Sequence, residues 1–433
     1  MITNRLSTYG VLATLALGGA TLSASANGFS LGAQDAFATA RGGAFVATAD
    51  NASAIYYNPA GLSQLEGLNF RGGVYGIYLD PTFSPPSGRA NSGNTYHIED
   101  NLAAVPQLFA AYTPKDWPLS FGLGVYSPYG GNISWPQDTG FRTIATSGSL
   151  TYLTINPVVA LKLAPGLSIA GGVMVNYANI DLESAILDVP SIRPPAPDFF
   201  RFKGNGWSVG YNLGLLWQPH QKVSLGATFR STATVRLDGQ TETEALNYDI
   251  SNTRRSARMD LQFPLSAVAG ISCRPTPKWN LEFDADYTDW SSFGTTAIYQ
   301  SPAPPGSFLS QWPQNPRLTL DWQASWMFEF GVTRYFDNGW HVSAGYVFSQ
   351  NSVPNAYYSP LAADLDRHFF SVGTGFKGKR FDFDVAYQLG YGPAHTVSGS
   401  SPSSLAGVIS NQNADGTYDF ISHAVMLTVG MHF

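Results

Sequence analysis

The histidines of this 433-residue chain show no spacing that would support metal binding or catalysis. No two of them lie at the separation that a metal site needs, and no phosphate-binding loop is present. We therefore expect no catalytic residue, no metal and no cofactor. A hydrolase-like Ser–His pair that only folding would bring together stays open at this point. The seven histidines are His97, His220, His341, His368, His395, His423 and His432.

Basic residues beside apolar stretches suggest a different chemistry, the binding of an apolar or amphipathic molecule. Residues 127–147 and 181–203 are rich in aromatic and aliphatic side chains, and cations flank them. These stretches either pack on themselves, with their cations solvated or ion-paired, or form a groove that captures ligand and binds a carboxylate. The candidate ligand contacts are Tyr129, Trp135, Phe141, Arg142, Phe199 and Phe200, with Arg201 and Lys203 as further cations.

The elements that position these residues are predicted from alternation. Between Trp207 and Trp217 the odd positions are apolar or aromatic, and most even positions are small or polar. Two tryptophans ten positions apart lie roughly 25 Å apart along the normal of a bilayer, which is the height of the apolar band of a membrane barrel. Only 12% of residues are charged, against about 25% in soluble domains. We therefore expect an all-β membrane protein.

Charges within the predicted strands fall on the lumen side of the alternation. A charge at the lipid midplane would cost about 2–4 kcal/mol, so this placement favours a barrel. A soluble sandwich could alternate in a similar way, but it would not need paired aromatic girdles. The charges assigned to the lumen are Arg230, Arg236, Glu282, Asp284, Asp286, Asp382 and Asp384.

We predict a 14-stranded antiparallel transmembrane β-barrel over residues 66–433. Short turns are expected near residues 114–118, 164–166, 219–222, 275–278, 337–339 and 378–379, and long loops between the other strand pairs, including 239–256. Short turns mark the periplasmic end, so both termini are expected in the periplasm. The strands are predicted to begin near Leu68, Leu102, Leu119, Leu150, Leu167, Gly206, Lys222, Arg258, Trp279, Gln323, Trp340, His368, Arg380 and Tyr418.

The N-terminal part has two expected functions. Residues 1–26 have the basic start, apolar stretch and Ala24-Ser25-Ala26 site of a secretory signal peptide. Residues 27–65 are rich in small residues and lack strand alternation, so we interpret them as a hatch or plug inside the lumen. Arg41 and Asp50 are the charges expected to tie this plug to the wall.

Several motifs in the same order carry a family resemblance. Asn58-Pro59-Ala60-Gly61-Leu62 closes the plug segment, which begins near Gly28-Phe29. Further matches are Gly204-Asn205-Gly206-Trp207, Tyr287-Thr288-Asp289-Trp290 and Asp366-Arg367-His368. The chain resembles the FadL-type long-chain fatty-acid transporters of bacterial outer membranes, a family that includes aromatic-hydrocarbon channels.

The resemblance implies uptake of a hydrophobic small molecule, with Gly28 and Phe29 reaching into its pocket. Pro128, Gly130 and Gly131 interrupt a strand. They mark either a plain loop start or an inward kink, and such a kink opens a lateral release gap in the family. The final strand ends at Phe433 and resembles the signal read by the barrel-assembly machinery. The remaining expectations are contact with the lipid bilayer and lipopolysaccharide, a monomer, and, at a net charge of −6, no nucleic-acid partner.

Two other functions stay open for such a barrel. A general diffusion porin would need an open polar lumen, which the plug argues against. A structural or adhesive barrel would not affect solute uptake. The sequence does not choose between a fatty acid and an uncharged hydrocarbon.

Overall fold

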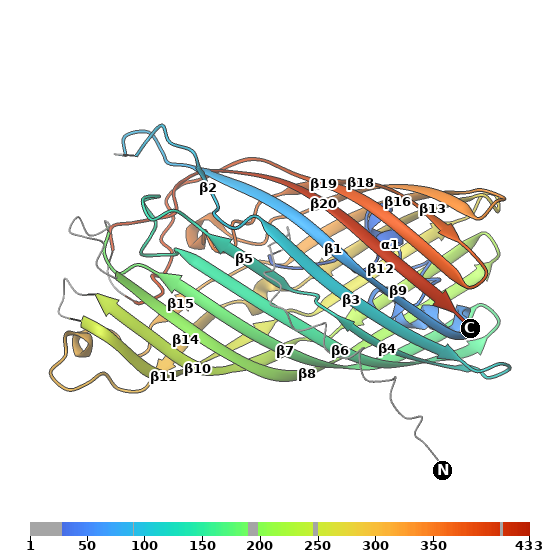
Figure 1. The fold of residues 1–433 in the computed structure, drawn as a ribbon, viewed down its shortest axis with the longest axis horizontal. Helices are drawn as coiled ribbons and strands as arrows, with labels where there is room; N and C mark the ends of the chain where they lie inside the picture. Colours follow the sequence, from blue (N-terminus) through green and yellow to red (C-terminus); the bar gives the residue numbers. More distant parts are fainter. Residues whose placement is uncertain (1–27, 90, 189–197, 246–249, 408–409) are drawn as a thin grey trace, which may run out of the picture.

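The computed structural model describes residues 28–89, 91–188, 198–245, 250–407 and 410–433. These residues form a long closed β-barrel with little helix (Figure 1). The helices are α1 (Ala36–Ala40), α2 (Ala54–Tyr57) and short 3-10 turns, η1 (Pro59–Gln64) among them. None of the described helices has the length and apolar character needed to cross a membrane.

The described wall contains fourteen antiparallel barrel strands, as the alternation predicts. Four of these strands are interrupted and divide into the pairs β4/β5, β9/β10, β11/β12 and β13/β14. Strand β1 pairs with both β3 and β20, which closes the barrel. The strands are β1 (Gly67–Ser84), β2 (Tyr96–His97), β3 (Leu102–Thr113), β4 (Leu119–Tyr126), β5 (Gly130–Ser134), β6 (Ser147–Ala164), β7 (Leu167–Ser184), β8 (Asp198–His220), β9 (Val223–Arg230), β10 (Ala233–Ala245), β11 (Ile250–Phe263), β12 (Ser266–Cys273), β13 (Trp279–Thr288), β14 (Thr295–Gln300), β15 (Arg317–Thr319), β16 (Ser325–Tyr335), β17 (Trp340–Ser349), β18 (Arg367–Lys377), β19 (Phe381–Val397) and β20 (Gly416–His432).

The side-chain alternation sorts residues between the outer face and the lumen. In β8, Trp207 is 61% exposed on the outer face, and the odd positions through Trp217 share that face. Asn212 and Leu216 on the other parity are buried. In β20, Val425 and the other odd positions face outward in the same way. A wall that is apolar outside and small or polar inside is the pattern of a membrane barrel.

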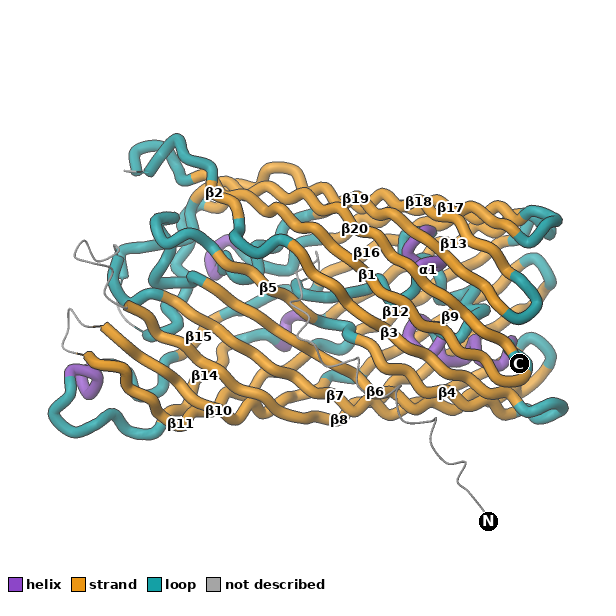
Figure 2. The backbone as a smooth tube through the Cα atoms, viewed as in Figure 1, coloured by secondary structure: helices purple, strands orange, loops and turns teal. Residues whose placement is uncertain are grey.

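The two ends of the barrel differ in the length of their connections (Figure 2). Short turns such as 114–118 and 221–222 join strands at the end that carries the C-terminus, and long loops gather at the opposite end. The predicted loop at 239–256 is wrong over most of its length, because β10 and β11 pair as a hairpin from Ala233 to Phe263. Strand β8 likewise begins eight residues earlier than expected, at Asp198. Both extensions add backbone hydrogen bonds beyond the apolar band.

One lumen assignment is also wrong. The side chain of Arg236 is 59% exposed on the outer face, where it forms an ion pair with Asp238 at 3.2 Å. Ser231 and Thr232 separate β9 from β10, and the alternation reverses across them. Above this break Val235 and other apolar side chains point inward and polar ones outward. The reversal fits the height of β10, since water and lipid headgroups surround the barrel there and an apolar interior lies within.

Candidate functional site

The N-terminal segment, residues 28–65, lies inside the barrel and is buried over most of its length. Its helices lie in the half of the barrel nearer the C-terminus (Figure 2). Helix α1 begins with Asp35 as its N-cap, whose carboxylate accepts from the backbone N–H of Ala38 at 3.2 Å. An N-cap carboxylate satisfies a donor that the helix itself leaves open. The same carboxylate connects this segment to the wall.

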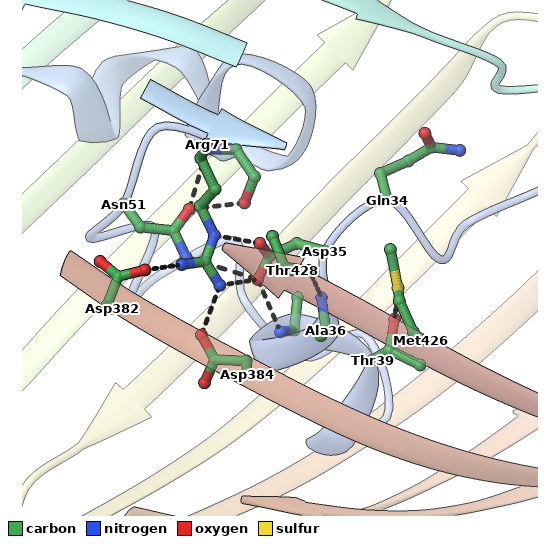
Figure 3. Close-up of polar contacts among 12 residues, drawn as sticks. Gln34, Asp35, Ala36, Thr39, Asn51, Arg71, Asp382, Asp384, Met426 and Thr428 are labelled. Carbon is green, nitrogen blue, oxygen red and sulfur yellow. Dashed lines mark hydrogen bonds and ion pairs between the residues drawn. The ribbon is translucent and has the colours of Figure 1, made fainter. Parts of the chain in front are cut away.

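Arg71 of β1 lies at the centre of the first polar network (Figure 3). Its guanidinium forms ion pairs with Asp35, with Asp382 at 2.7 Å and with Asp384 at 2.6 Å. All four side chains are almost completely buried. His341 contacts Asp384 at 2.7 Å on the far side of the network. One cation thus joins the N-terminal segment to carboxylates of β19, in a place where an unpaired charge would be costly.

A second network holds the middle of the segment against β13. Arg41 pairs with Glu282 at 3.1 Å, with both side chains fully buried. The carboxylate of Asp284 accepts the backbone N–H groups of Phe45 and Val46, each at 2.8 Å. The expected tie through Arg41 is therefore present, and Asp50 lies 3.7 Å from Arg274. These bonds satisfy backbone donors that have no strand or helix partner.

The motif Asn58-Pro59-Ala60 fits closely against β8. The side chain of Asn58 accepts from Ala60 N and donates to the carbonyl oxygens of Val46 and Leu215, at 2.8 and 2.9 Å. Gly214 faces this motif, and a Cβ there would lie 2.5 Å from Asn58 Oδ1. A side chain at Gly214 would therefore push the motif away from the wall.

Phe29 lies in a cluster of aromatic rings above these networks. Its ring centroid is 4.9 Å from that of Trp290, 5.3 Å from Phe293 and 5.4 Å from Trp322. The ring of Tyr129 packs on another side of Phe29, with the two ring centroids 6.3 Å apart. Edge-to-face contacts of this kind add about 0.5–1.5 kcal/mol each beyond simple burial. Aromatic packing thus contributes to holding the start of the segment in place.

Gly28 is held by its neighbours in a left-handed conformation. Its φ is +67°, and a Cβ would lie 2.7 Å from the ring of Trp290. Its backbone N–H donates to Asp364 Oδ2 at 3.2 Å. Asp364 belongs to the long loop between β17 and β18, so this bond links the start of the segment to a loop at the opposite end from the short turns. Burial raises the pKa of Asp364, although Arg367 acts in the other direction.

The wall bends between β4 and β5, where Pro128 interrupts it. Strand β3 pairs with β4 only from Leu108 to Tyr112, so 103–107 have no strand partner on that edge within the described residues. The N-terminal segment lies beside this bend. Leu31 N donates to Pro128 O at 2.8 Å, and Gly130 N donates to Phe29 O at 3.0 Å. The kinked strand therefore pairs with the segment inside the lumen.

An apolar cavity of about 140 Å³ lies between Phe29 and the long loops. No Asp, Glu, Lys, Arg or His is among its described lining residues. The cavity therefore offers burial to an apolar body and no ion pair to a charged group. Side chains that line it include Phe29, Leu150, Ile180, Met259, Leu261, Phe293, Leu320, Trp322 and Leu361, together with Gly131 of the kink.

The other expected ligand contacts lie outside this lining. Trp135 and Phe141 are buried against each other, with ring centroids 5.7 Å apart. Arg142 pairs with Asp198 at 2.7 Å in a buried position. Phe200 is buried, and Phe199 is partly buried beside it in β8. Arg201 and Lys203 pair with Asp181 at 2.6 and 3.0 Å. These cations are therefore engaged in ion pairs with neighbouring carboxylates.

Sequence reasoning did not find Met259, Leu261, Leu320 and Trp322. The first two lie in β11, on the parity that faces lipid in a regular membrane strand. The signal that could have identified them is that the side chains alternating with them in β10 and β11 are polar. A polar alternate face indicates an outer surface in contact with water or headgroups, and hence an apolar interior. Leu320 and Trp322 follow β15 in a long loop, where no periodic pattern marks them.

The described residues contain no cluster of three or more potential metal ligands. Gly206-Trp207-Ser208-Val209-Gly210 has the spacing of a hydrolase nucleophile motif, but it lies within the continuous strand β8. That motif requires a sharp turn from a strand into a helix. The arrangement around Ser208 is therefore that of a barrel strand.

The fold and the site together define an outer-membrane β-barrel with its own N-terminal segment in the lumen and an apolar cavity above it. A sequence model of the family described as outer membrane protein transport protein (OMPP1/FadL/TodX) matches residues 18–433, and this chain belongs to that family. It is thus an outer-membrane transport protein.

Individual relatives and structures agree with this assignment. The long-chain fatty acid transport protein of Salmonella typhi is 24% identical over 376 residues, which cover 79% of this chain and 83% of that protein. The 47 kDa outer membrane protein of Pasteurella multocida is 24% identical over 369 residues, covering 80% and 81%.

Among solved structures, a Pseudomonas aeruginosa FadL homologue has a TM-score of 0.77 at 18% identity, covering 94% of this chain and all of that one. The toluene transporter TodX of Pseudomonas putida has a TM-score of 0.69 at 14% identity, covering 94% and 99%. At these identities the structural likeness establishes the fold.

Proposed function

We propose that this protein passes hydrophobic molecules inward across the outer membrane, passively and without a chemical step. A ligand is caught among the long loops, enters the apolar cavity and rests against Phe29. The cavity carries this proposal, because none of its described lining residues is charged and Phe29 of the N-terminal segment borders it. A buried segment in the lumen also supports this function over that of a water-filled porin.

The size of the cavity favours a small ligand. A cavity of about 150 Å³ lined by aliphatic and aromatic side chains is known to hold one benzene molecule. At about 140 Å³ the present cavity suits a monoaromatic hydrocarbon, or one end of a longer chain. A fatty acid would have to keep its carboxylate outside, since no cation is among the described residues that line the cavity. Relatives named for fatty-acid transport and structures named for toluene transport fit both options.

The exit is proposed to lie at the bend between β4 and β5. The support is the pairing of Phe29 and Leu31 with Gly130 and Pro128, beside residues 103–107 of β3, for which the described residues supply no strand partner on that edge. Movement of residues 28–34 would open this edge toward the lipid. The ion pairs of Asp35 and Arg41 hold the rest of the segment in place. A ligand drives such a movement only if it binds the moved state more tightly.

The remaining features complete the proposal. Residues 27–65 act as a hatch, and residues 1–26, outside the described residues, act as a removable leader. The strand that ends at Phe433 is read by the assembly machinery. The long loops contact lipopolysaccharide, and the barrel works as a monomer.

The experiment measures uptake of labelled toluene and labelled oleate by a deletion strain that carries the wild-type gene or a kink variant. In the variant, Pro128→Val, Gly130→Val and Gly131→Ala rebuild a regular strand. We expect wild-type cells to take up ligand and the variant to lose most of this activity while still assembling. Equal uptake in the variant would reject lateral release. No uptake by wild-type cells, with steady large-channel current in planar bilayers, would favour the porin. Mass spectrometry of ligand retained by the purified protein identifies its class.

A further inference from the structure

A second interruption of the wall lies beside the β10–β11 hairpin, on the edge of β11 that faces β14. Strand β11 pairs with β14 only from Ala257 to Met259, and β12 resumes pairing with β13 at Ser266. Residues 260–265 therefore have no strand partner on this edge among the described residues. Two hydrogen bonds cross the interval, from Thr296 Oγ1 to the carbonyl of Asp260 at 2.8 Å and from Asp289 N to the carbonyl of Leu265 at 3.0 Å.

A recess of about 390 Å³ occupies this interruption. Its outer rim is polar and includes Asp260, Gln262 and Arg317. No ion pair joins Arg317 to another described side chain. A polar rim around an apolar throat suits a molecule that arrives from the headgroup region with its apolar part leading.

The recess and the apolar cavity share part of their lining. Four side chains border both spaces, and they come from β11, β14 and the loops beside them. One layer of side chains therefore stands between the outer surface and the cavity at this point, without an intervening paired strand. The shared residues are Leu261, Phe293, Thr296 and Leu320.

The register of the strands gives the height of the recess. Asp238 of β10 pairs with Asn205 of β8, so Arg236 lies level with Trp207, at the outer aromatic edge of the apolar band. Thr234 pairs with Gln262, one step nearer the membrane centre. The recess thus opens sideways at the boundary between the outer leaflet and its headgroups, rather than upward among the loops.

We propose that this recess is a side entrance through which hydrophobic molecules dissolved in the outer leaflet reach the cavity. The entrance is distinct from the bend between β4 and β5, which lies on other strands. It rests on the proposed function and adds a route to it: ligand crosses between β11 and β14, past Leu261 and Phe293, and meets Phe29 from the side. An apolar solute that is concentrated in lipid would gain access without first returning to water.

The test blocks the recess with one bulky side chain. Thr234→Trp places an indole at its rim, and Gln240→Trp places the same group on the same exposed face of β10, six residues further along the strand. We expect Thr234→Trp to lower the initial rate of labelled toluene uptake at least threefold, with Gln240→Trp close to wild type. Heat-modifiable migration on gels verifies that both variants form barrels. Equal rates in the two variants would overturn the proposal.

A second measurement avoids any effect of substitution on assembly. Gln262→Cys and Gln240→Cys are made in a Cys273→Ala background, and the folded proteins are then labelled with a bulky maleimide. Uptake should fall on labelling of Gln262→Cys and stay unchanged on labelling of Gln240→Cys. Unchanged uptake at fully labelled Gln262→Cys would exclude the side entrance. Failure of the proposed function is a separate result, because wild-type cells would then show no uptake in either experiment.

Discussion

The backbone N–H of Leu31 donates to the carbonyl oxygen of Pro128 at 2.8 Å, which joins the N-terminal segment to the bend in the barrel wall. Because proline cannot donate to a β-ladder, the wall is already weakened at this position. The segment pairs with the interrupted strand and thereby occupies part of the gap. Any movement of residues 28–34 is therefore coupled to the continuity of the wall at that point.

The buried pair of Arg71 and Asp35 predicts a large stability effect. Arg71→Met leaves Asp382 and Asp384 buried without their cation, which should cost about 3–5 kcal/mol. Arg236→Met is the matched control, since that ion pair with Asp238 is exposed and should contribute no more than about 1 kcal/mol. Urea unfolding of the two variants in detergent micelles measures the difference. Similar losses in both would show that Arg71 does not hold the segment.

The conformation of Gly28 predicts a local effect at the start of the segment. Gly28→Ala meets both a left-handed φ and the rings of Trp290 and Trp322. The left-handed backbone alone costs about 1–2 kcal/mol, so amide exchange of residues 29–31 should quicken by roughly tenfold. Gly32→Ala is the control, because no atom lies within 4 Å of a Cβ at that position. If Gly32→Ala produced the same change, the contacts of Gly28 would not be the cause.

Asp364 predicts a dependence of stability on pH. Its pKa is raised by burial, so the folded state holds this proton more tightly than the unfolded chain does. The stabilisation from this group is full below the ordinary Asp pKa of about 4 and is lost as pH rises through the folded value. Asp364→Asn keeps an acceptor for Ser352 and Gly28 and removes the titration. The stability of the variant relative to wild type should therefore increase as pH rises from about 4 through the folded pKa of Asp364. Thermal unfolding at several pH values measures this difference. A difference in stability between variant and wild type that does not change with pH would contradict the raised pKa of Asp364.

Trp322 predicts how the cavity selects among small ligands. It lines the cavity, and its buried Nε1 has no hydrogen-bond partner among the described residues. An unpaired buried donor costs free energy that an oxygen-bearing ligand would recover. Trp322→Phe should weaken binding of benzyl alcohol about fivefold to tenfold and leave binding of toluene within about twofold. Isothermal titration of the purified protein measures both ligands. Equal losses for the two would assign Trp322 a packing function only.

Much of the wall was predictable because the sequence of a membrane strand, read by itself, indicates which of its side chains face lipid. Trp207 and Trp217 share a face because side chains alternate with a period of two, and lipid demands apolar groups on that face. Turn lengths then ordered the strands without further information. The reasoning failed at Arg236, because Ser231 and Thr232 change the parity and the strand leaves the apolar band at the same point. Alternation reports which residues share a face, but not which medium that face meets.

The sequence by itself determined the strand count, the low-charge outer surface and the presence of a non-strand segment before the barrel, since each depends on neighbours along the chain. Only the tertiary structure decided that Asp35 meets Arg71, that Gly28 meets Asp364, and that Leu261 and Leu320 enclose one cavity with Phe29. Gly28 and Asp364 lie 336 positions apart, and even Asp35 and Arg71 are separated by 36 positions, which is beyond the range of any local pattern. These contacts depend on the closure of the barrel around its own beginning, and no local pattern in the chain records that geometry.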